Sequence, residues 1–158
     1  MRYNNIELKS IEFLLNSNAT EDLEKILNSL SKILPKNFDQ NKIEIKNLMG
    51  AYGNSIRTLK ITIRDKDNIE LILKNLENLI DNESKIKIYD NFEDRLDEKG
   101  TFYIRFNKFS LFENKLIISN QSDIILLKIN FQKLFGKNSS HLILRSYLES
   151  KGLIKSNN

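Results

Sequence analysis

The sequence predicts an α+β fold in which helices cover one face of a mostly antiparallel sheet. Short stretches alternate apolar and polar residues, as half-buried strands do, and longer stretches repeat apolar residues at helical spacing. Most neighbouring strand-like stretches are joined by connections too short to carry a crossover helix. The predicted order is β-α-β-β-α-(α)-β-β-β-α, with the other face of the sheet partly solvated.

The composition is that of one globular domain with a weakly basic surface. The 158 residues are enough for a substantial core, which we expect over 1–152, followed by a frayed tail over 153–158. A net charge of +4 favours an anionic partner such as nucleic acid. The chain has no Cys and therefore no disulfide or thiolate site. No apolar run approaches the roughly 20 residues that span a bilayer, and no signal peptide is recognisable, so we expect a cytoplasmic protein without a membrane contact.

The first elements are a strand and a helix. Apolar residues alternate over Asn5–Leu15 and change phase near Ser10, which predicts a strand with a β-bulge. Asn16-Ser17-Asn18 should end this strand. Thr20 then suits the N-cap of a helix that stops before Pro35.

A hairpin with a wide loop follows. Alternation over Ile43–Lys46 and again over Leu59–Arg64 predicts two strands, the second with one apolar and one largely basic face. Gly53-Asn54 predicts a turn between them because both residue types accept a positive φ. Tyr52 lies at the tip of this loop, where it either contacts a ligand or folds back onto the sheet.

Helices and one further strand are predicted after the hairpin. Asp65 is a suitable N-cap for a helix that reaches Ile80, and residues 81–84 should break it. Residues 85–97 are ambiguous, since 85–88 alternate like a strand while Ile88 and later apolar residues fit a helix, which we favour. Residues 101–107 alternate clearly, so Phe102, Ile104 and Phe106 should be buried, with Tyr103 and Arg105 exposed.

The last part of the chain returns to the sheet. We expect a helical turn over 108–112, a short strand over 116–118 and a longer strand over 124–131. Gly136 and the polar residues after it should precede a final helix that Gly152 ends.

The chain offers little for catalysis. His141 is the single histidine, and one imidazole without acidic neighbours in sequence builds no usual metal or hydrolase site. An acidic cluster could in principle hold a divalent cation, but basic residues interrupt it, and a solvated helix end is the favoured interpretation. Its members are Asp90, Glu93, Asp94, Asp97 and Glu98. We therefore expect no enzyme activity, no metal and no cofactor.

Basic and aromatic residues give a better indication of function. Tyr103 and Arg105 share one strand face, and aromatic rings beside guanidinium groups are typical of single-stranded RNA recognition. The residues expected to contact nucleic acid are Tyr52, Asn54, Arg57, Lys60, Arg64, Tyr103, Arg105 and Lys108.

Two motifs resemble an archaeal family of small RNA-binding proteins described as predicted exosome-associated subunits. The motifs are Tyr52-Gly53-Asn54-Ser55-Ile56 and Asp97-Glu98-Lys99-Gly100-Thr101-Phe102-Tyr103-Ile104-Arg105-Phe106-Asn107-Lys108, and the resemblance extends over about Asn5–Phe131. Ser55 stands where the family pattern has Pro, and Asn107-Lys108-Phe109 where it has Asp-Lys-Gln. The resemblance implies an α+β fold like that of the ribosomal protein that binds five-S rRNA, with no cofactor and no catalytic residues.

Together these observations favour a non-catalytic RNA-binding protein, an accessory of RNA processing or of ribosome assembly with a protein partner in that process. The alternative is a protein-interaction or scaffolding domain whose basic face meets an acidic partner. An open sheet edge would also allow pairing with a second copy, and the sequence leaves the oligomeric state undetermined.

Overall fold

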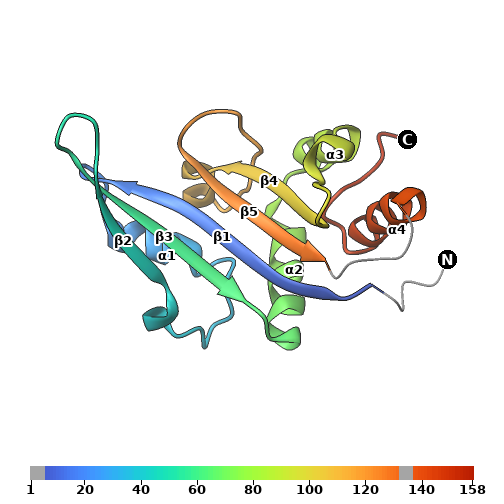
Figure 1. Ribbon diagram of the computed structural model, residues 1–158, viewed down its shortest axis with the longest axis horizontal. Helices are drawn as coiled ribbons and strands as arrows, with labels where there is room; N and C mark the ends of the chain where they lie inside the picture. The colour runs from blue at the N-terminus through green and yellow to red at the C-terminus, as the bar shows by residue number, and fades with distance from the viewer. Residues whose placement is uncertain (1–5, 132–136) are drawn as a thin grey trace.

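The computed structural model describes residues 6–131 and 137–158, which form a five-stranded antiparallel sheet with helices on one side (Figure 1). The strand order across the sheet is β2-β3-β1-β5-β4. The strands are β1 (Leu8–Asn18), β2 (Glu44–Met49), β3 (Ser55–Ile63), β4 (Thr101–Asn107) and β5 (Ile124–Phe131). The helices are α1 (Leu23–Leu30), α2 (Lys66–Leu79), α3 (Asn82–Asp90) and α4 (Lys137–Ser150), with short 3-10 turns η1 (Gln40–Lys42), η2 (Glu93–Arg95) and η3 (Phe109–Glu113). The predicted fold class is confirmed, while the predicted strand start at Asn5 and the turn at Gly136 lie outside the described residues.

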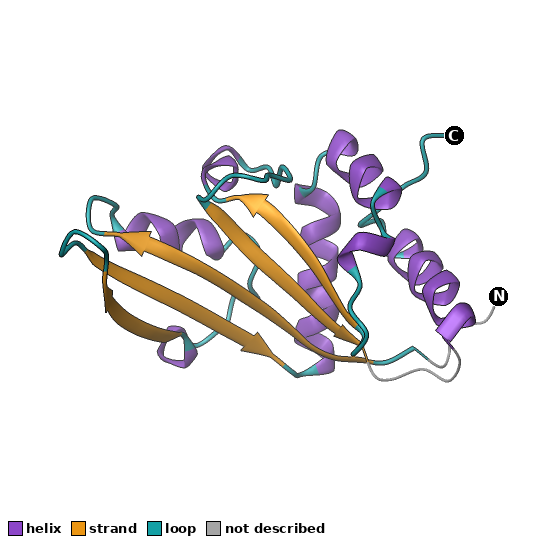
Figure 2. Ribbon diagram, turned by 45° about the horizontal axis from the view of Figure 1, so that its top comes forward, coloured by secondary structure: helices purple, strands orange, loops and turns teal. Residues whose placement is uncertain are grey.

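Every second residue of the four longer strands points into the core beneath the sheet. Phe102, Ile104 and Phe106 of β4 are buried, as the alternation predicts. The same side carries the other buried strand residues, Ile11, Phe13, Leu15, Leu59, Ile61, Ile63, Ile125, Leu127, Ile129 and Phe131. Helices α1 and α2 lie behind this side of the sheet, and α3 and α4 lie beyond β4 (Figures 1 and 2). The opposite face of the sheet has no described helix in front of it (Figure 2).

The bulge near Ser10 is confirmed, because the pairing of β1 with β5 shifts register between Leu8 and Ser10. The end of β1 differs from the prediction. Asn16, Ser17 and Asn18 continue the strand, since each has a partner on β3. Polar residues do not end this strand because the neighbouring strand satisfies their backbone groups.

Carboxylate caps fix the helix starts. Asp65 accepts a hydrogen bond from the Asn68 N–H at 3.0 Å, which confirms the predicted cap of α2. The N-cap of α1 is Asp22 instead of Thr20. The predicted break after α2 is confirmed, since α2 ends at Leu79, and Asp81 then caps α3, the helix favoured for the ambiguous segment, which begins earlier than predicted. Asp and Asn are common both in loops and at N-caps, so their presence in a sequence does not distinguish a loop from a helix start.

Three further predictions are corrected or refined. Helix α1 ends at Leu30 and not just before Pro35. Residues 116–118 make isolated bridges through Leu116 and Ile118 and form no strand of the sheet, whereas the turn after Asn107 is present as η3. The tail is not frayed at its start, because Leu153 and Ile154 are both buried.

Candidate nucleic-acid interface

The face of the sheet turned away from the helices, called the open face below, carries the even-numbered side chains of β1, β2, β3 and β5 and the odd-numbered side chains of β4. The pairing register aligns these side chains in rows across the strands. One row runs Thr62, Glu12, Lys128, Tyr103 and the next runs Glu44, Lys60, Leu14, Leu126, Arg105. Residues from β3 and from β4, distant in sequence, therefore share one surface.

Cations outnumber anions on the open face. Its basic residues are Lys46, Lys60, Arg105 and Lys128, with Arg64 directly after β3, and its strand carboxylates are Glu12 and Glu44. The Asp97 carboxylate borders the face at Tyr103. The Lys60 ammonium lies 4.0 Å from a Glu12 carboxylate oxygen, and half-exposed pairs of this kind are weak. The Lys60 charge therefore stays available to a phosphate at small cost.

Tyr103 is held in place at the β4 end of its row. Its hydroxyl donates to Asp97 Oδ2 at 2.9 Å, and the Lys128 ammonium lies 5.8 Å from the centre of its ring. The hydrogen bond to Asp97 and burial both raise the pKa of Tyr103, so the phenol stays neutral at physiological pH. The prediction of an exposed Tyr103 is only partly met, since the residue is half-buried, whereas Arg105 is exposed.

The β2–β3 hairpin ends in a protruding loop. The last pair between β1 and β3 joins Asn18 to Ile56, so the loop projects past the end of β1 (Figure 1). Gly53 has a φ of 76°, the left-handed conformation that the turn prediction requires. Tyr52 at the tip is 93% exposed, so it does not fold back onto the sheet.

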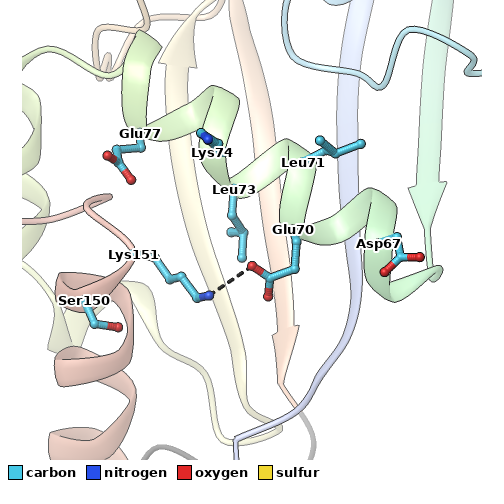
Figure 3. A pocket seen from close by; sticks show the side chains of 8 residues that line it. All are labelled: Asp67, Glu70, Leu71, Leu73, Lys74, Glu77, Ser150 and Lys151. Carbon is cyan, nitrogen blue, oxygen red and sulfur yellow. Dashed lines mark hydrogen bonds and ion pairs between the residues drawn. The ribbon is translucent and has the colours of Figure 1, made fainter.

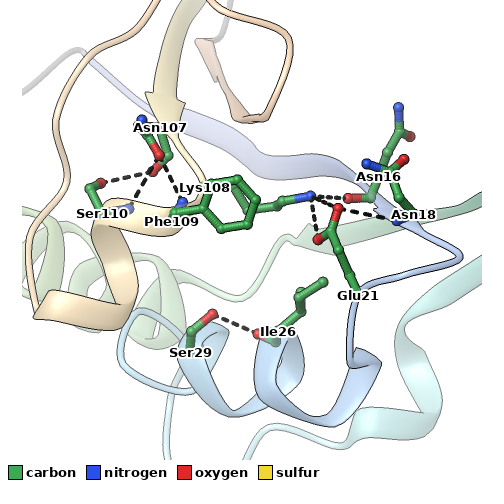
Figure 4. A network of polar contacts seen from close by, with 9 residues as sticks. All are labelled: Asn16, Asn18, Glu21, Ile26, Ser29, Asn107, Lys108, Phe109 and Ser110. Carbon is green, nitrogen blue, oxygen red and sulfur yellow. Dashed lines mark hydrogen bonds and ion pairs between the residues drawn. The ribbon is translucent and has the colours of Figure 1, made fainter.

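Two predicted site residues do not belong to the open face. Arg57 is exposed but has the same strand parity as Leu59 and Ile61, so it projects from the helix side of the sheet. Lys108 is buried, with a side chain 3% exposed. Its ammonium donates to the Asn16 carbonyl at 2.7 Å (Figure 4). Lys108 is corrected from a phosphate contact to a structural residue because it follows β4 into the turn over α1.

The ammonium of Lys108 also forms an ion pair with Glu21 at 2.7 Å (Figure 4). In the same network, the Asn107 side-chain oxygen accepts from the Phe109 N–H at 2.8 Å and starts η3. Asn107 and Lys108 therefore stabilise the conformation of the chain directly after β4.

Sequence reasoning missed several residues of the open face, among them Lys46, Lys128, Leu14 and Leu126. The period-two rule that identified Lys60 and Arg105 also applies to β2, β1 and β5. What the sequence lacked was the strand order, which places β1 and β5 between β3 and β4.

A groove of about 570 Å³ between α2 and α4 is a poor match for a polyanion (Figure 3). The Glu70 carboxylate and the Lys151 ammonium pair across it at 3.0 Å. Three carboxylates and two ammonium groups line it, together with apolar and hydroxyl groups: Asp67, Glu70, Leu71, Leu73, Lys74, Glu77, Ser150 and Lys151. The open face is therefore the better candidate for phosphate binding.

Two members of the acidic cluster, Glu93 and Asp97, and His141 have structural partners. Glu93 contacts both His141 and Arg145, which joins η2 to α4. Asp97 accepts the N–H groups of Lys99 and Thr101 at 2.9 and 2.8 Å. Within residues 6–131 and 137–158 no group of three potential ligands gathers to hold a metal ion. Nor does any helix in the described part have the length and apolarity to cross a bilayer.

Comparison with known sequences identifies relatives over most of the chain. The family described as RNA binding matches residues 10–131. The RNA-binding protein PAB1135 of Pyrococcus abyssi is 33% identical over 70% of this chain and 73% of its own length. The uncharacterized protein MJ0213 of Methanocaldococcus jannaschii is 28% identical over 86% of this chain and 93% of its own length.

Solved structures of similar fold include proteins from two further archaea. Protein AF2318 from Archaeglobus fulgidus superposes with a TM-score of 0.74 at 22% identity, covering 92% of this chain and 99% of that one. Mth689, a DUF54 protein from Methanothermobacter thermautotrophicus, gives a TM-score of 0.70 at 22% identity, over 91% and 97% of the two chains. At this level of identity the likeness supports the fold alone.

Proposed function

The chain belongs to the family described as RNA binding, and from this premise we propose that it binds RNA without catalysis through the open face of its sheet. The observation that carries the proposal is the five cations gathered from β2, β3, β4 and β5 and from the residue after β3, against two strand carboxylates. Lys and Arg side chains that neutralise phosphates supply most of the affinity of such proteins.

The apolar and aromatic residues of the open face favour single-stranded RNA over a duplex. Leu14 and Leu126 lie between Lys60 and Arg105 in one row and offer apolar surface to an unpaired base. Tyr103 lies beside Lys128 in the next row and offers an aromatic ring. Bases stack on aromatic side chains in single strands, whereas a duplex keeps its bases inside and presents mainly phosphates and ribose. In this arrangement Arg105 and Lys60 contact phosphates on either side of a base at the centre.

Tyr52 and Asn54 extend the proposed site at the hairpin tip. The ring of Tyr52 is almost fully exposed, and the loop that carries it projects beyond the sheet. We propose that Tyr52 stacks on a base at one end of the bound strand and that Asn54 offers its amide to the same nucleotide.

The cellular role proposed here is that of an accessory of RNA processing or ribosome assembly in the cytoplasm, working with a protein partner. The sequence motifs named above support an association with an exosome and a fold related to the ribosomal protein that binds five-S rRNA. Both remain proposals.

The test is a titration of the purified protein with a single-stranded RNA and a duplex RNA of equal length at two salt concentrations. We expect tighter binding to the single strand and a steep loss of affinity with salt. Binding that is insensitive to salt, or absent for both RNAs, would favour the alternative of a scaffolding domain whose basic face meets an acidic protein.

A further inference from the structure

The two edge strands of the sheet, β4 and β2, differ in the hydrogen bonds of their outer sides. At the β4 edge, flanking segments bond to both ends of the strand: the Asp97 N–H donates to the Thr101 carbonyl at 3.0 Å, and the Ser119 N–H donates to the Arg105 carbonyl at 2.9 Å. These segments leave only the middle of that edge, around Tyr103, open to a further strand. At the β2 edge, no described segment lies on the outer side of the strand in the sheet order.

The hydrogen-bonding pattern of the hairpin shows which groups of β2 face outward. The Gly50 N–H donates to the Asn54 carbonyl, in the same register that pairs Glu44 with Lys60. Bonded and non-bonded pairs alternate along an antiparallel ladder, so even-numbered residues of β2 bond to β3. The N–H and C=O groups of Ile45, Asn47 and Met49 therefore point away from the sheet, and no backbone partner for them is found among the described residues.

This open edge carries three exposed apolar side chains beside Glu44, Lys46 and Asn47. All six residues of β2 are exposed, with Ile45 at 43%, Leu48 at 52% and Met49 at 76%. Proteins usually protect a free edge with charges, proline or a bulge. Glu44 and Lys46 are the only charges of β2, which has no Pro and an unbroken register with β3. Aliphatic side chains beside free backbone groups suit another β-strand and offer nothing to a phosphate.

The sequence of β2 is compatible with pairing to itself. With a two-fold axis at Asn47, Ile45 of one copy lies opposite Met49 of the other, Lys46 lies opposite Leu48, and the outward-facing residues bond to each other. Moving the axis by one residue toward the N-terminus places Lys46 opposite Lys46, and like charges directly opposite are unfavourable. Moving the axis by one residue toward the C-terminus places Ile45 opposite Ala51, which lies outside β2.

We propose that two copies of this chain pair antiparallel through β2, with the two-fold axis at Asn47, to form one continuous ten-stranded sheet (twice five). Both open faces then lie on the same side of the joined sheet, because a two-fold axis perpendicular to a sheet preserves its faces. The pairing stands on the free edge and its apolar residues, and it is independent of whether the open face binds RNA.

Sedimentation equilibrium of the full chain without RNA tests the proposal. We expect a dimer for the wild type. Ile45→Lys with Met49→Lys should raise the dimer dissociation constant about tenfold or more, because each pair then brings two ammonium groups together. Ile45→Lys with Met49→Glu should restore the dimer through two opposite-charge pairs. The matched control is Leu71→Lys on α2, which changes an apolar side chain of similar exposure (50%) and should leave the dimer unchanged.

A cysteine crosslink locates the axis without disturbing the apolar pairs. The chain has no Cys, so Asn47→Cys introduces a single thiol, and mild oxidation should link two copies rapidly. Leu48→Cys, one residue away, should link far more slowly because it faces Lys46. A monomeric wild type, a charge-swapped variant that stays monomeric, or equal linking at the two positions would overturn the proposal. A monomer whose RNA affinity falls on changing Ile45 would assign the edge to RNA instead.

Discussion

The Lys108 ammonium lies 2.7 Å from a carboxylate oxygen of Glu21, and the two side chains are 3% and 14% exposed. Lys108 follows the last residue of β4, and Glu21 lies in the turn between β1 and α1. The pair thus ties the two ends of these strands to the helix layer.

Replacing Lys108 by Ala should destabilise the protein by about 3–5 kcal/mol, because the Glu21 carboxylate is left in a poorly solvated site without its counter-ion. Urea denaturation measures this loss. Lys60→Ala, which removes an exposed ammonium, should cost less than about 0.5 kcal/mol. The double variant Glu21→Gln with Lys108→Met should recover much of the stability, and equal losses for Lys108→Ala and Lys60→Ala would contradict the assigned role.

Asp97 should make the stability depend on pH in the acid range. Burial alone raises the pKa of Asp97, but the hydrogen bonds from Thr101, Tyr103 and Lys99 outweigh it and lower that pKa below the ordinary 3.8. A carboxyl group with a lowered folded-state pKa stabilises the protein at pH values above 3.8, and this contribution is lost as the pH falls through the folded value.

Asp97→Asn should therefore lower the free energy of unfolding at pH 7 by at most about 1 kcal/mol, because solvent screens this carboxyl group, and the difference from wild type should shrink below about pH 4. Urea denaturation at a series of pH values measures both quantities. Asp90→Asn, in the same acidic segment, is the control. A difference that stays constant down to pH 2 would show that Asp97 acts through shape and not through charge.

Tyr103 should act in RNA binding through its ring. Tyr103→Phe keeps the ring and loses the hydrogen bond to Asp97, so we expect near wild-type affinity for single-stranded RNA with a small loss of stability, about 0.5–1.5 kcal/mol. Tyr103→Ala should cost about 1–3 kcal/mol of binding if a base stacks there. Fluorescence titration measures the affinities, and similar losses for the two variants would point to the hydroxyl in place of the ring.

Alternation in the sequence was enough to predict the buried and exposed sides of β3 and β4. Successive side chains of a strand point to opposite faces, so a strand with one buried face alternates apolar and polar residues. Lys60, Arg64 and Arg105 were placed correctly on this basis. The same rule, applied consistently, puts Arg57 on the opposite side from Lys60, three residues away, which the sequence analysis overlooked. Lys108 was misplaced for another reason: the strand ends at Asn107, and the following turn directs the next side chain inward to a carboxylate 87 residues away.

The full width of the open face was not predictable from local patterns. Lys46 and Lys128 join it only because β2 pairs with β3 and β5 lies between β1 and β4, and strand order is set by long-range packing. Similarly, the buried positions of Leu153 and Ile154 depend on contacts of the chain end with the body of the protein. A short terminal segment with two apolar residues has no helical or strand periodicity from which their burial could be predicted.

The most direct test of the RNA-binding face compares two exposed arginines on opposite sides of the sheet, Arg105 on the open face and Arg57 on the helix side. The affinity of each alanine variant for a single-stranded RNA is measured over a range of salt concentrations, with circular dichroism to confirm folding. If the open face binds RNA, Arg105→Ala weakens binding and reduces the slope of log affinity against log salt by about 0.7, the value for one phosphate contact with a single strand, while Arg57→Ala behaves as wild type. Loss of affinity and slope in Arg57→Ala, with Arg105→Ala unchanged, would contradict the account and place RNA on the helix side.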